Sequence, residues 1–83
     1  MHNQTQINED LKNFEEDSNW FYKNIEFLRK NEFTNKYVAI KGKQVIASGN
    51  KIEIVIQKVD EEGQNPATIF ISFVHPKGYT LLL

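Results

Sequence analysis

The alternation of short apolar runs with turn residues between Lys36 and Leu83 is the feature that most limits how this chain can fold. Residues 37–40 and 45–47 are apolar and strand-like, and Gly42-Lys43 between them suits a two-residue turn with glycine first. This pattern predicts a β-hairpin near the middle of the chain.

A helix is predicted directly after the hairpin. Asn50, with Glu53 three residues later, has the form of a capping box, in which side chains satisfy the free N–H groups of a helix start. Apolar residues then recur at helical spacing until Gly63, a typical stop signal. Three isoleucines in this stretch also alternate as in a strand, but the cap and the stop favour a helix.

The strongest strand signal lies at residues 67–74, which are rich in Ile and Phe. Pro76 and Gly78 occupy the second and fourth positions of a turn, and residues 79–83 then complete a second hairpin. The connection between the two hairpins has the length of a right-handed βαβ crossover. We expect an α/β domain of the α+β type in two or three layers. Its order is αββαββ, with a four-stranded mixed sheet and two helices.

The first segment carries apolar residues at spacings of three and four, typical of a helix face, with an interruption at Ser18. One interpretation is a single helix from about residue 7 to residue 30. The other is a helix capped by Asp17 or Ser18 that runs to about Asn31. We favour the second, because Ser and Asp compete for backbone hydrogen bonds inside helices. It divides the chain into an acidic arm, flexible or partly helical, at residues 1–17, and one domain at residues 18–83.

The composition is that of one small globular domain. The chain has 83 residues, no cysteine and a net charge of −1, so disulfides and thiolate metal sites are excluded. After residue 17, nine Lys and Arg against six Asp and Glu leave a mild positive excess, well short of a dedicated nucleic-acid binder. No apolar run has membrane length and the polar start does not resemble a signal peptide, so we expect a cytoplasmic protein.

The pairing of the segments KYVAI (residues 36–40) and VIASG (residues 45–49), followed by a helix and a Leu-rich C-terminal strand pair, resembles a family of short archaeal and bacterial proteins. That family is catalogued as a domain of unknown function. The resemblance covers residues 18–83, with Trp20-Phe21 and Leu28 similar to the family's leading helix. It implies an architecture and no catalytic residues. Some relatives occur beside genes for retropepsin-like aspartic proteases, which implies an accessory role. The acidic arm and the turn at residues 75–78 depart from the family pattern.

The sequence offers no catalytic constellation. His75 stands at the first position of the Pro-Lys-Gly turn, and no nucleophile signature accompanies it, so it is interpreted as a turn residue. The carboxylates of residues 60–62 fall in the last turn of the predicted helix and lack the ligand spacing of a calcium loop. We therefore predict no catalytic, cofactor-binding or metal-binding residues.

A weak candidate for an anion site is the start of the predicted helix, where free N–H groups point outward. Its residues are Ser48, Gly49, Asn50 and Lys51. They lack the glycine patterns of phosphate and dinucleotide loops, so ordinary capping is the favoured interpretation. Lys51 and three hairpin lysines also raise the hypothesis of single-stranded nucleic-acid binding, although scattered lysines more often serve solubility.

Both alternating sets of side chains at residues 67–74 are largely apolar, so both faces of the predicted sheet need cover. Two helices on opposite faces would provide that cover within one chain. If both helices share a face, a second subunit must cover the other face or the C-terminal edge, and we favour this alternative. The predicted interaction surface consists of Phe70, Val74, Leu81, Leu82 and Leu83.

We therefore expect a non-enzymatic interaction or accessory module that associates with itself, preferably as a dimer, or with an unknown protein partner. Two alternatives remain open. One is a nucleic-acid accessory protein, motivated by the positive excess after residue 17. The other is a small-ligand or hydrolytic enzyme that uses the helix start at residues 48–50 together with His75.

Overall fold

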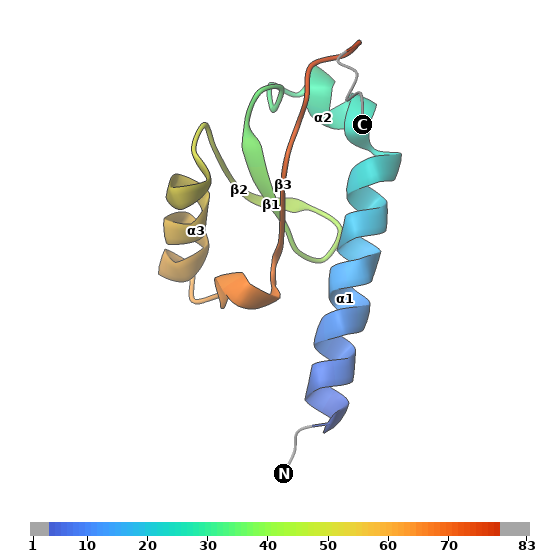
Figure 1. Cartoon of the computed structure of the whole chain (residues 1–83), viewed down its shortest axis with the longest axis vertical. Coiled ribbons are helices and arrows are strands. Elements are labelled where there is room, and N and C mark those ends of the chain that lie inside the picture. The colour runs from blue at the N-terminus through green and yellow to red at the C-terminus, as the bar shows by residue number, and fades with distance from the viewer. Residues whose placement is uncertain (1–3, 79–83) are drawn as a thin grey trace, which may run out of the picture.

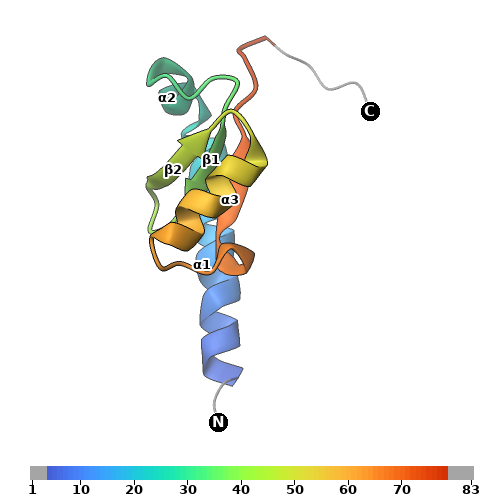
Figure 2. The same ribbon diagram turned by 90° about the vertical axis from the view of Figure 1, so that its left-hand side faces the viewer.

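A computed structural model describes residues 4–78 as a mixed α+β fold, in which a three-stranded antiparallel sheet of order β2-β1-β3 lies between helices (Figures 1 and 2). The strands are β1 (Tyr37–Ile40), β2 (Val45–Gly49) and β3 (Phe70–Phe73), and the helices are α1 (Gln4–Lys23), α2 (Ile25–Lys30), α3 (Ile52–Glu61) and the short 3-10 helix η1 (Pro66–Thr68). Helices α1 and α2 cover one face of the sheet and α3 covers the other, which makes three layers.

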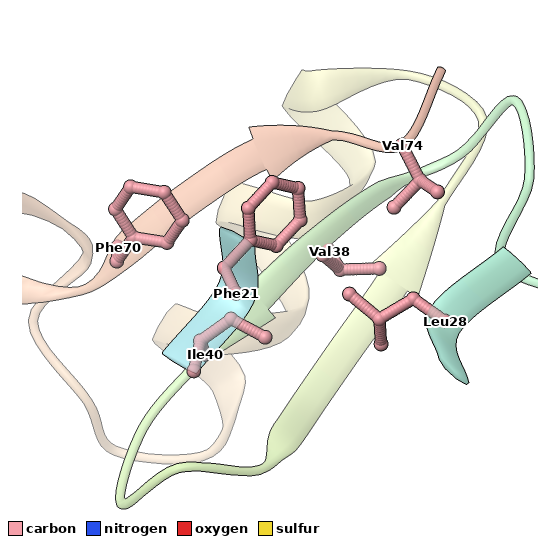
Figure 3. Packing of buried hydrophobic residues seen from close by; sticks show 6 residues of the cluster. All are labelled: Phe21, Leu28, Val38, Ile40, Phe70 and Val74. Carbon is pink, nitrogen blue, oxygen red and sulfur yellow. The ribbon is translucent and has the colours of Figure 1, made fainter. Parts of the chain in front are cut away.

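The core is built around β1, whose residues Val38, Ala39 and Ile40 have no exposed surface. Because successive side chains of a strand point to opposite faces, Val38 and Ile40 lie in the layer of α1 and α2, and Ala39 lies in the layer of α3. Figure 3 shows the first cluster, whose members are Phe21, Leu28, Val38, Ile40, Phe70 and Val74. The second cluster consists of Ala39, Val55, Val59 and Ile69.

The predicted crossover is present, but the predicted mixed sheet is wrong. Strands β2 and β3 both pair antiparallel with β1, so they run in the same direction and α3 connects them across β1. No parallel pair forms between the described strands, because β1, the most buried of the three, takes the central position between β2 and β3. The fourth strand, predicted at residues 79–83, lies outside the described residues.

The last strand begins later than the predicted residue 67. Asn65 accepts the N–H of Ala67 through its side-chain oxygen at 3.0 Å, and Pro66 stands at the first position of η1. Proline is favoured at the start of a helical turn because its fixed φ fits and its missing N–H is not needed there. Ala67 and Thr68 therefore belong to η1, and β3 starts at Phe70.

The tight turn of the hairpin and the stop of α3 are confirmed. Gly42 and Lys43 both have a φ of 62°, the sign pattern of the hairpin turns that match strand twist. Gly63 has a φ of 80° and donates its N–H to the Asp60 carbonyl, while Gln64 donates its N–H to the Val59 carbonyl. These two hydrogen bonds are those of a Schellman motif at the helix C-terminus.

The predicted capping box at the start of α3 is wrong. The N-cap residue is Lys51, with an extended backbone at φ −135° and ψ 142°, and no side chain caps the helix. Asn50 is one residue too early to reach the free N–H groups. Glu53 instead lies in the first turn of α3, where its negative charge interacts favourably with the helix dipole.

The predicted helix start at Asp17 or Ser18 is also wrong, because α1 runs without interruption from Gln4 to Lys23. The buried Asp17 carboxylate does not cap a helix; it accepts the backbone N–H of Lys43 at 2.9 Å and so ties α1 to the hairpin turn. The helix is instead interrupted at Asn24, the N-cap residue of α2, which begins at Ile25. Within residues 4–78, no helix is both long and apolar enough to cross a bilayer.

Replacement of Asp17 by alanine should lower the free energy of unfolding by about 1.5–3 kcal/mol, because the Lys43 N–H then loses a charged acceptor at a buried site. Urea unfolding followed by circular dichroism measures this difference. Glu16→Ala is the matched control, since Glu16 is the exposed neighbour on the same helix. Equal unfolding midpoints for the two variants would contradict the assignment.

Candidate protein interaction site

The outer edge of β3 presents unpaired backbone groups. Val74 donates its N–H to the Lys36 carbonyl at 2.9 Å, which establishes which residues face β1. Because alternate residues of an antiparallel ladder bond the same neighbour, Ser72 also faces β1, whereas Ile71 and Phe73 direct their N–H and C=O groups away from the sheet. No strand within residues 4–78 pairs with these outward groups. The described part of the sheet therefore ends in an open strand edge.

The other edge strand, β2, is protected by two features that β3 lacks. Its register with β1 shifts between Ala39 and Ile40, which is a β-bulge. In addition, the Lys58 Nζ donates to the Ser48 carbonyl at 2.7 Å and places a charge beside the strand. Bulges and lysines are two of the ways in which proteins prevent pairing at exposed edges. Of the two edges, β3 is thus the one that can accept another strand.

Aromatic side chains border the open edge on the face covered by α1. The ring of Phe70 lies 5.5 Å from Phe14, 5.4 Å from Phe21 and 6.3 Å from Tyr22, measured between centroids. A groove of about 330 Å³ runs beside the rings of Phe21 and Tyr22, and the Tyr22 side chain is 64% exposed. The complete lining consists of Phe21, Tyr22, Ile25, Arg29, Ser72, Phe73 and His75.

The opposite border of the edge is aromatic as well. The Phe73 ring lies 5.0 Å from Tyr37 and 4.9 Å from His75. Figure 1 shows β3, in orange to red, running between α1 and α3. A strand added to β3 would therefore meet backbone partners at its edge and apolar surface on its flanks, which is the arrangement that β-strand addition uses.

Two residues of the predicted interaction surface belong to the core. Phe70 is 8% exposed and Val74 is fully buried, because α1 and α2 cover their face of the sheet within the same chain. These two residues are therefore not free to contact a partner, and the alternative with helices on opposite faces is the correct one. Leu81, Leu82 and Leu83 lie outside the described residues.

Sequence reasoning missed Tyr22 and Ile25, which line the groove, and the role of Ser72 at the edge. A signal for the edge was present, since β3 carries neither Lys nor Pro to prevent pairing. No sequence signal placed Tyr22 beside the edge. The spacing of apolar residues along α1 shows which of its residues face the sheet, but it does not show that β3 is the strand at the edge.

The predicted anion site receives no support from the geometry. Gly49 packs against α3, since a Cβ there would lie 3.0 Å from the Ile54 Cγ2. Asn50 and Lys51 are exposed, and Glu53 already supplies a negative charge at the start of α3. The candidate formed by residues 48–51 stays a prediction.

The residues considered for catalysis or nucleic-acid binding are dispersed. Among the described residues, no group of three or more His, Cys, Asp or Glu side chains could hold a metal ion. The backbone carbonyl of His75 accepts from the Arg29 Nε at 2.8 Å, which joins α2 to the end of β3. Lys41 and Lys43 share a cleft of about 280 Å³ with Asp17 and two other acidic residues, whose charge opposes phosphate binding there.

The fold and the edge define the class as a small three-layer α+β domain with a three-stranded antiparallel sheet. Residues 29–76, more than half of the chain, match the family described as "Family of unknown function (DUF5678)". The chain belongs to this family. The matched segment contains all three strands and α3 but not α1, so Trp20, Phe21 and Leu28 lie outside it. No curated protein and no solved structure matches the chain.

Hydrogen exchange tests the open edge directly. In dilute protein, the amide protons of Ile71 and Phe73 should exchange faster than those of Ser72 and Val74, because only the latter two donate to β1. Site-resolved exchange by NMR measures all four in one experiment, so the alternate residues serve as the internal control. Equal protection of the four at high dilution would mean that another part of the chain covers the edge.

Proposed function

We propose that the protein is a non-enzymatic interaction module that associates with itself by strand pairing at the outer edge of β3. The observation that carries the proposal is the contrast between the two edges. The edge of β2 has a bulge and a lysine contact, whereas no strand within residues 4–78 pairs with the outward backbone groups of Ile71 and Phe73, which lie between apolar flanks. Since helices cover both faces of the sheet, pairing at an edge replaces pairing through a face.

An antiparallel pair of β3 strands satisfies all of the outward groups. With a twofold axis at Ser72, Ile71 of each protomer exchanges two hydrogen bonds with Phe73 of the partner subunit, and the two Ser72 side chains face each other. The four bonds together contribute roughly 2–6 kcal/mol, at about 0.5–1.5 kcal/mol each. Association costs about 4–15 kcal/mol, so apolar or charged contacts beside the strands must add to them.

Ser72→Lys tests the pairing, with Ser48→Lys as its matched control. Both serines pair with Val38, one on each side of it, so the two variants place the same side chain on opposite edges of the sheet. Ser72→Lys should convert the dimer into a folded monomer, because it sets two positive charges against each other across the axis. Ser48→Lys should leave the dimer intact.

Sedimentation velocity measures the mass of each variant, and circular dichroism confirms that it is folded. A wild-type protein that stays monomeric at high micromolar concentration would refute the proposal. A Ser72→Lys variant that dimerises as well as Ser48→Lys would refute pairing at this edge.

A further inference from the structure

We infer that the same dimer has a second contact, in which the first half of each α1 lies against α2 of the partner subunit. This inference rests on the proposed function, since it takes the β3 pair as given. It identifies the occupant of the exposed surface of α1 as a second copy of this chain, in antiparallel orientation.

Helix α1 projects beyond the sheet that it covers. Its 20 residues span about 30 Å at roughly 1.5 Å per residue, whereas the four residues of β3 span about 13 Å. Figures 1 and 2 show the N-terminal part of α1 extending past the end of the sheet. We call residues 4–15 the overhang; near its end, Phe14 still contacts β3. Leu11 of the overhang is 61% exposed, although it belongs to the same apolar face of α1 as the buried Phe21.

The helices follow β3 from its start to its end. Phe14 contacts Phe70 at the start of β3, and Arg29 bonds the His75 carbonyl just beyond its end. Between them, Tyr22 shares the groove with Ser72. A twofold axis at Ser72 exchanges the two ends, so the overhang of one protomer lies beside α2 of the other.

The sequence positions agree with this exchange. Tyr22 is the midpoint between Glu15 and Arg29, and Tyr22 and Phe21 are the residues of α1 that line the groove beside Ser72, where the axis lies. In the antiparallel arrangement, Glu15 therefore comes level with Arg29 of the partner subunit. Leu11 comes level with the residues that follow α2 of the partner subunit.

The charges favour this orientation over the others. Residues 9–16 carry a net charge of −3, and residues 23–30 carry a net charge of +2. An antiparallel pair sets the acidic half of each helix against the basic half of the other, within the screening length of about 8–10 Å. A contact between the two overhangs would instead set acid against acid. The acidic residues are Glu9, Asp10, Glu15 and Glu16, with Lys12 among them, and the basic residues are Lys23, Arg29 and Lys30, with Glu26 among them.

The most exposed apolar residues lie on the same helices as these charges. Among the described residues, the three most exposed large hydrophobic side chains are Leu11, Tyr22 and Phe27, which is 54% exposed. All three belong to α1 and α2, the helices on the face that becomes continuous when two β3 strands pair. A second copy would cover apolar surface in the helix layer as well as the strand edge. These apolar contacts would add to the backbone hydrogen bonds in offsetting the free-energy cost of association.

Single cysteines test the orientation, since the natural chain has none. Ser72→Cys should form an intermolecular disulfide in high yield, because facing residues of an antiparallel pair have Cβ atoms about 4.5–5.5 Å apart. Leu11→Cys should not be joined by a short bis-maleimide, because the two overhangs point to opposite ends of the dimer. Efficient cross-linking of Leu11→Cys would place the two overhangs side by side, and so would overturn both this inference and the twofold axis at Ser72.

Charge reversal tests the second contact by itself. Glu15→Lys should raise the dissociation constant of the dimer about ten-fold at low salt, since it affects both symmetric contacts, and the difference should shrink as salt screens the charges. Glu62→Lys is the control, because Glu62 is also exposed but lies at the end of α3 on the other face. An equal dissociation constant for the two variants would refute the contact, whereas a monomeric wild-type protein would refute the proposed function itself.

Discussion

The structure depends on the antiparallel pairing of β1 with a strand on each side. The central position leaves Val38, Ala39 and Ile40 without exposed surface, and their side chains alternate between the two faces. Each face then needs its own cover, which α1 and α2 supply on one side and α3 on the other. A domain of this size has few other apolar residues to bury, so the three-layer arrangement follows from the central strand.

This arrangement also limits where a second strand can reach the sheet. Helices cover both faces of the sheet within residues 4–78, so a strand can be added at an edge, and the two edges differ in chemistry. Lys58 and a bulge make the edge of β2 a poor template, whereas β3 combines outward backbone groups with the exposed ring of Tyr22. The family match at residues 29–76 includes the open edge but excludes α1, which contributes most of its apolar border in this chain.

Sequence reasoning was wrong where a polar side chain had two local options, and at Asp17 a distant contact decided between them. Asp17 resembles a helix cap, but the N–H of Lys43, far away in the sequence, takes its carboxylate, so the helix continues through it. Asn50 has the spacing of a capping box, but the extended backbone of Lys51 starts α3 one residue later. Asn65 and Pro66 shorten the last strand by the same kind of local competition.

By itself, the sequence determined the hairpin around Gly42-Lys43, the helix that ends at Gly63 and the two-sided apolar character of the last strand, because turns, caps and alternation depend on neighbouring residues. Only the tertiary structure decided that β1 lies between β2 and β3, that the helices lie on opposite faces, and that no strand within residues 4–78 pairs with the outer edge of β3. The alternation of side chains shows that a strand has two apolar faces. It does not show which strands become its neighbours, because that choice depends on how the whole chain packs.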